Sequence, residues 1–175
     1  MDWATQRNLS VRGGRESGAV FTECDKYRPL LWRVLDPSKP MALWIMLNPS
    51  TADENVLDPT ITRCRNFSMD WGYGGLLVCN LFDYRATYPK NMKVQAEPVS
   101  DHNQLAILQA ANVADLIVCA WGVHGQHQGQ DQLILAWLLA AKHTLYYLAL
   151  TKIGMPKHPL YLRGDLEPMR YELED

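Results

Sequence analysis

The sequence lacks the marks of several protein classes. Its 175 residues include four cysteines and no Cys-x-x-Cys pair, which favours buried free thiols in a reducing cytoplasm over a disulfide framework. No apolar run is long enough to span a bilayer. The first ten residues are polar and hold no signal-peptide core. We therefore expect a cytoplasmic protein with no membrane association.

A large net charge is also missing. The formal net charge is -2, so the whole-chain charge does not indicate nucleic acid, although it is compatible with a local basic patch. With 47% hydrophobic and 21% charged residues, the chain should form one soluble domain with one core. Residues 1–19 hold little apolar material and are expected to form a flexible tail, followed by a single α/β domain over residues 20–175. We expect a monomer.

Apolar runs and helical patterns alternate along the rest of the chain. The runs indicate strands at residues 30–35, 41–47, 76–82, 116–121 and 145–150. The helical patterns occupy residues 60–70, 101–112 and 130–142. This alternation predicts a three-layer α/β/α domain with a mostly parallel, four-stranded central sheet. The first run, joined to the second by a turn at residues 36–40, should add an N-terminal antiparallel hairpin.

The stretch 45–54 organises the predicted domain. An apolar run ends there in Asn48-Pro49, and proline holds the residue before it in an extended conformation. Asp58 and Pro59 then have the residue types of a helix N-cap and first helical position. A strand that ends in a polar loop before a helix N-terminus is where α/β proteins place their chemistry.

Polar loops follow four of the predicted strands. In a parallel sheet the carboxyl ends of the strands lie at one edge, so residues far apart in sequence should converge there. The candidates are Asn48, Asp53, Asn80, Asp83, Arg85, His124 and His158.

Other interpretations of these residues remain open. His124 and His127 have the types of a metal pair, but without a nearby carboxylate a solvated loop is favoured and no metal is expected. Asp83 and Arg85 are compatible with an ion pair that holds their loop. Trp121 is compatible with core packing or with stacking on a base. The cluster of Lys152, Lys157 and Arg163 is compatible with phosphate contacts or with an ordinary solvated face.

The residues from 27 to 162 carry motifs that resemble a known family. The motifs include Leu47-Asn48-Pro49-Ser50-Thr51-Ala52-Asp53, Trp71-Gly72-Tyr73-Gly74, Ala120-Trp121-Gly122 and His158-Pro159-Leu160-Tyr161-Leu162. They resemble the family called domain of unknown function 1643, found in bacteria and their viruses. That resemblance implies no activity.

The order and spacing of three of these motifs also resemble the uracil-DNA glycosylase superfamily. This second resemblance implies that Asn48 positions the attacking water, assisted by Asp53, that Asn80 reads the base, and that His158 donates a hydrogen bond to the leaving base. It further implies a pocket shaped by Thr51, Asp83, Arg85 and Trp121, and DNA phosphate contacts from Lys152, Lys157 and Arg163.

This chain differs from that superfamily at the base pocket. Met46 and Ser50 stand where the superfamily has glycines, and no aromatic residue lies between positions 58 and 61, where the superfamily stacks uracil. The resemblance therefore implies a DNA glycosylase-like enzyme that needs no cofactor, hydrolyses the N-glycosidic bond of a damaged, mismatched or modified base, and leaves an abasic site. Two alternatives stay open: a non-catalytic nucleic-acid or nucleotide-binding protein of phage defence or counter-defence, and a hydrolase of free nucleosides or nucleotides.

Overall fold

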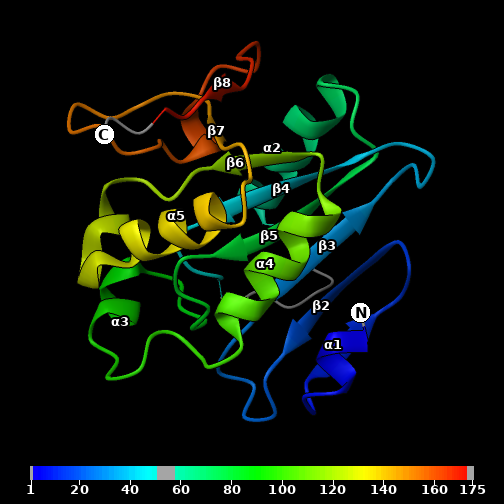
Figure 1. Cartoon of the computed structure of the whole chain (residues 1–175), viewed down its shortest axis with the longest axis vertical. Coiled ribbons are helices and arrows are strands. Elements are labelled where there is room, and N and C mark those ends of the chain that lie inside the picture. Colours follow the sequence, from blue (N-terminus) through cyan, green and yellow to red (C-terminus); the bar gives the residue numbers. More distant parts are fainter. Residues whose placement is uncertain (1, 51–57, 173–175) are drawn as a thin grey trace.

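The computed structural model describes residues 2–50 and 58–172. Within them one sheet has eight strands in the order β1-β2-β3-β5-β4-β6-β7-β8 (Figure 1). The strands are β1 (Ser10–Gly13), β2 (Ser17–Phe21), β3 (Leu30–Val34), β4 (Met41–Met46), β5 (Gly75–Asn80), β6 (Leu116–Cys119), β7 (Tyr146–Tyr147) and β8 (Met169–Arg170).

The sheet is mixed rather than mostly parallel. The β4–β5, β4–β6 and β6–β7 pairs are parallel, whereas the β1–β2, β2–β3, β3–β5 and β7–β8 pairs are antiparallel. The fold is therefore mixed α/β, and the prediction of a mostly parallel, four-stranded sheet does not match it. Short antiparallel strands extend the sheet at both ends, and β1 and β8 have no fully buried residue that would mark them in the sequence.

The predicted hairpin between residues 30–35 and 41–47 is wrong. β3 pairs antiparallel with β5, with Leu31 opposite Val78, and β5 separates it from β4. The turn after β3 packs on the residue before β5, since the amides of Leu35 and Asp36 both donate to the Gly74 carbonyl at 2.8 Å. A Cβ on Gly74 would lie 2.0 Å from the Asp36 carbonyl oxygen, so glycine is needed for this approach.

The N-terminal segment belongs to the packed domain, which differs from the expected tail. Helix α1 (Asp2–Thr5) precedes β1 and β2, and the side chains of Ala4 and Leu9 are buried. The Trp32 indole donates to the Gly14 carbonyl at 3.0 Å and ties the β1–β2 turn to β3. A few apolar residues spaced along a polar segment are thus enough to dock it.

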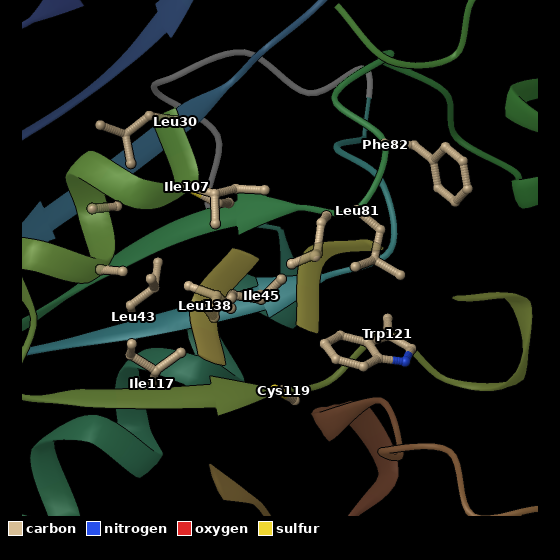
Figure 2. Close-up of a cluster of buried hydrophobic side chains, with 14 of the residues drawn as sticks. Leu30, Leu43, Ile45, Leu81, Phe82, Ile107, Ile117, Cys119, Trp121 and Leu138 are labelled. Carbon is tan, nitrogen blue, oxygen red and sulfur yellow. The ribbon is translucent and has the colours of Figure 1, made fainter. Parts of the chain in front are cut away.

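Helices cover both faces of the sheet. Helix α2 (Pro59–Asp70) packs on one face, while α4 (Asn103–Val113) and α5 (Gln130–Ala140) pack on the other (Figure 1). Along β4 the side chains alternate between these faces, as in any strand: Leu43 and Ile45 face α4 and α5, and Trp44 faces α2. Figure 2 shows side chains of the hydrophobic cluster on the face that α4 and α5 cover.

The observed start of α2 agrees with the sequence prediction, whereas the observed start of α4 does not. Helix α2 begins as predicted, because the Asp58 carboxylate accepts the Ile61 amide at 2.8 Å and Pro59 occupies the first helical position. Helix α4 begins at Asn103, two residues after the start of the predicted helical pattern, and Ser100 binds Asp83. A short helix, α3 (Pro89–Lys93), lies between β5 and α4. None of the helices in residues 2–50 and 58–172 is long and apolar enough to cross a membrane.

Candidate functional site

A pocket of about 400 Å³ opens at the carboxyl ends of three parallel strands. Asn48 follows β4, Asn80 ends β5, and Trp121 lies two residues beyond β6. These three side chains line the pocket together with His124 and with His158, which comes from the loop before the 3₁₀ helix η2 (Pro159–Tyr161). The volume lies within the range of small-molecule sites. The structure thus brings together Asn48, Asn80 and His158, which are 110 positions apart at most.

Asn80 is the buried polar group of this pocket. Its residue is 3% exposed, and its side-chain amide has no hydrogen-bond partner among the described residues. Its main-chain carbonyl, in contrast, accepts from the Asn103 side chain at 3.2 Å. No Asn80 atom is among the buried side-chain nitrogen and oxygen atoms that lack a partner, so the amide is accessible from the pocket. The side chain is therefore placed to bind a ligand in the pocket.

The Asn48 side chain has a fixed orientation. Its Nδ2 donates to the carbonyls of Ala86 at 2.7 Å and Pro49 at 3.1 Å. Two carbonyl acceptors assign that atom as nitrogen, so Oδ1 occupies the other side of the amide. No donor in the described part of the chain reaches Oδ1, which leaves it able to accept a hydrogen bond from water or a ligand.

The His158 ring can donate from one nitrogen only. The Leu160 amide donates to Nδ1 at 3.4 Å, so the proton of the neutral ring resides on Nε2. Burial lowers the pKa of His158, while the Asp58 carboxylate acts to raise it. The ring is therefore neutral at pH 7 and presents Nε2–H. The segment after it is attached to α2, because the Arg63 guanidinium donates to the Leu162 carbonyl.

Trp121 combines packing with a place in the pocket wall. It is 2% exposed and lies at one end of the core cluster (Figure 2). Gly125 packs directly on its indole ring, since a Cβ there would lie 2.2 Å from the ring carbon Cδ1. Both interpretations of Trp121, core packing and pocket lining, therefore apply to the same side chain.

Asp83 and Arg85 are not among the described residues that line the pocket, which corrects the prediction that they shape it. Asp83 is fully buried and accepts from both the amide of Ser100, at 2.7 Å, and its hydroxyl. Burial raises the pKa of Asp83 to about 6. Arg85 forms an ion pair with Asp25 at 3.2 Å and lies over the Phe21 ring. Both side chains therefore have a structural role: Asp83 binds the segment before α4, and Arg85 binds the segment between β2 and β3. Thr51 and Asp53 lie outside the described residues.

The predicted phosphate contacts lie on the surface near His158. Lys152 and Lys157 are exposed. Arg163 is also exposed, but its guanidinium pairs with the Asp165 carboxylate, with Nε 3.0 Å from Oδ1. None of these three residues is among the described residues of the pocket wall. Only the two lysines keep a charge that is not compensated by a described ion pair.

The described residues contain no cluster of metal-ligating side chains and no disulfide. No group of three or more His, Cys, Asp or Glu side chains within residues 2–50 and 58–172 is arranged to hold a metal ion. The His124 ring instead lies 3.1 Å from the Lys93 ammonium. All four cysteines are free: three are buried, as expected, and Cys24 is exposed. Burial raises the pKa of the Cys64 thiol.

Arg28 is a pocket residue that the sequence did not reveal. It lines the pocket and is only 3% exposed. It precedes β3, which runs antiparallel to β5, so the start of β3 lies at the same edge as the end of β5. The Arg28 amide donates to the Asp83 carbonyl at 2.8 Å. The predicted hairpin gives β3 the same orientation but places its start beside the end of β4, whereas the observed pairing places it beside the end of β5, where Asn80 lies.

The fold and the pocket define a mixed α/β domain with a ligand site at the carboxyl ends of its parallel strands. Residues 28–160 match the family described as protein of unknown function (DUF1643), and the chain belongs to this family. No curated protein and no solved structure matches the chain.

Proposed function

We propose that this protein is a DNA glycosylase-like hydrolase with a fold of the uracil-DNA glycosylase type. It would cleave the N-glycosidic bond of a damaged, mismatched or modified base and leave an abasic site. The observation that carries this proposal is that the Asn80 amide, which has no described hydrogen-bond partner, lines the same pocket as Asn48 and His158.

Asn80 suits the recognition of a base. Its amide offers both a donor and an acceptor, and the hydrogen-bonding edge of a nucleobase presents the same two kinds of group. A base inside a duplex is not accessible to such a buried amide, so it must be flipped out of the stack. The pocket volume of about 400 Å³ is sufficient for one base with its sugar at the mouth.

Asn48 and His158 are suited to two different tasks in the hydrolysis, which are to orient the attacking water and to stabilise the leaving base. As the bond breaks, positive charge develops on the sugar and negative charge on the base. His158 presents a neutral Nε2–H, a fixed donor that stabilises the developing base anion. Asn48 has its Oδ1 open and would orient the attacking water. The buried Arg28 and the carboxylate of Asp58 line the same pocket.

The pocket wall favours a base other than uracil. Thr60 and Ile61 line it near the N-terminus of α2, where the resemblance to uracil-DNA glycosylases leads one to expect an aromatic platform. Further apolar lining includes Pro49, Pro89 and Trp121, together with Met46, Leu47, Val78, Ala86 and Val123. A pocket without that platform is compatible with a bulkier, modified base.

The proposal is tested with oligonucleotides that carry uracil, hypoxanthine, or hydroxymethylated or glucosylated cytosine. After incubation with the protein, alkali breaks the strand at each abasic site. We expect breaks on at least one substrate, strongly reduced with Asn48→Ala and unchanged with Asn66→Ala, a control at an exposed position of α2. No breaks on any substrate, or equal breaks with Asn48→Ala, would contradict the proposal.

Arg28 favours a second candidate, the hydrolysis of free nucleotides. The Arg28 side chain already has a partner within the protein, but a guanidinium has five N–H donors, so it can bind a phosphate group in addition. Under this alternative, nucleoside 5′-monophosphates would release their base faster than oligonucleotides do, and Arg28→Lys would affect monophosphates more than nucleosides. Binding of oligonucleotides without release of any base would instead indicate a non-catalytic binding protein.

A further inference from the structure

A second hollow, of about 440 Å³, adjoins the pocket. His124 and Pro89 line both of them. The other described residues of the second hollow are Tyr88, Lys90 and Lys93, which belong to α3 and the residue before it. Two elements far apart in sequence, α3 and the 3₁₀ segment η1 (Val123–Gly129), thus build it.

This hollow carries an uncompensated positive charge. The Lys93 ammonium lies 3.1 Å from Nδ1 of His124 and donates to it, which leaves its other N–H groups free to donate. Burial, and the charge of Lys93, lower the pKa of His124, so the imidazole remains a neutral partner. Neither Lys90 nor Lys93 forms an ion pair with a described residue, and none of the described lining residues is acidic.

The helix that carries the two lysines is fixed to the core. Met92, which lies between them, is fully buried and belongs to the core cluster. Lys93 is half-buried and contacts His124, which restricts its side chain, whereas Lys90 is exposed. The hollow therefore presents one restricted and one exposed lysine from a fixed helix.

The hollow also presents an aromatic ring. Tyr88 is 60% exposed, and the Lys90 ammonium lies 5.8 Å from its ring centroid. An exposed aromatic beside lysines is the combination by which proteins hold single-stranded nucleic acid, through stacking on a base and charge on the phosphate.

We propose that this hollow binds the phosphate and the flanking nucleotide of a polynucleotide strand whose next nucleotide enters the pocket. Lys90, Lys93 and His124 Nε2–H would contact the phosphate, and Tyr88 would stack on the flanking base. This inference rests on the proposed function and specifies its substrate, because a free nucleotide has no flanking residue to fill a second hollow.

The test is the salt dependence of binding to an unmodified single-stranded 15-mer, followed by fluorescence anisotropy. For Lys90→Gln/Lys93→Gln we expect the slope of log K against log salt to become shallower by about 0.7, the value for one phosphate that is no longer neutralised. The matched control is Lys39→Gln/Lys142→Gln. Lys39 lies in the turn before β4 and Lys142 just after α5, both away from the pocket, and the slope should not change. Tyr88→Ala should weaken binding about fivefold or more without changing the slope.

An unchanged slope in Lys90→Gln/Lys93→Gln would overturn the inference, as would an equal loss in the control pair or a loss confined to Lys152→Gln/Lys157→Gln. Competition by inorganic phosphate alone, with no difference between the variants on the strand, would show an anion site only and would also overturn it. Because the 15-mer needs no excision, the two proposals fail separately. If the protein releases a base but the salt slope is the same in Lys90→Gln/Lys93→Gln as in wild type, only this inference is wrong. If the salt slope changes but no substrate loses its base, only the proposed function is wrong.

Discussion

Asn80 and Asp83 are two buried polar residues, three positions apart at the end of the same strand, and their surroundings differ. Asp83 is satisfied, because Ser100 donates to both of its carboxylate oxygens. Asn80 is 3% exposed, and its amide, which has no partner within the described residues, lines the pocket. A buried polar group with protein partners indicates a structural role, whereas a polar group that lines a pocket without a protein partner can bind a ligand. The predictions below test this distinction.

The largest expected effect is at the donor to the leaving base. In His158→Ala the developing negative charge loses one hydrogen bond, so base release should fall about 100- to 1,000-fold. The side chain is at the rim of the pocket and partly exposed, so the thermal unfolding midpoint should change little. Single-turnover rates and thermal unfolding of the same samples check this. Loss of activity together with loss of folding would contradict a role limited to chemistry.

At Asp83 we expect the opposite pattern. Asp83→Ala leaves the Ser100 amide and hydroxyl without their acceptor, which should lower the free energy of unfolding by about 2–3 kcal/mol. Urea denaturation measures this value. Asp83→Asn keeps one acceptor oxygen and should cost less. A change below about 0.5 kcal/mol for Asp83→Ala would contradict the structural role, since surface substitutions have effects of that size.

Asp83 should also make stability depend on pH. Burial raises the pKa of its carboxyl in the folded state from 3.8 to about 6, so between these values the folded protein binds more protons than the unfolded chain. Its contribution to stability is therefore present below pH 3.8 and is lost as the pH rises to about 6, with a slope of at most about 1.4 kcal/mol per pH unit. Comparing wild type with Asp83→Asn isolates this contribution. Identical pH profiles would contradict it.

The smallest expected effect on stability is at Asn80. Asn80→Leu replaces an unpartnered buried amide with an apolar side chain of similar size. It should leave the free energy of unfolding unchanged or raise it by up to about 1 kcal/mol, while base release is lost. The same urea titration measures this. A loss of 2 kcal/mol or more would show that the amide has a structural partner and that the comparison with Asp83 is wrong.

The sequence predicted well those features that depend on neighbouring residues. The start of α2 at Asp58-Pro59 follows from local capping chemistry. Asn48, Asn80 and His158 meet because the apolar runs before them do form strands that end at one edge, although each strand ends one to three residues earlier than predicted. Features that depend on distant pairing were missed. The partner of β3, the docking of residues 2–19 and the pocket position of Arg28 all follow from which strands are neighbours. No local pattern shows that Ser100 binds Asp83 rather than capping α4.

The most direct test of the central claim is to quantify free base and abasic sites together. Oligonucleotides with different modified bases are incubated with the wild-type protein, free base is measured by mass spectrometry, and abasic sites are measured with an aldehyde-reactive probe. We predict that both products form in equal amounts from at least one substrate, and that neither forms with Asn48→Ala. Formation of neither product from any substrate, or release of the base still attached to its sugar, would contradict hydrolysis of the N-glycosidic bond in this pocket.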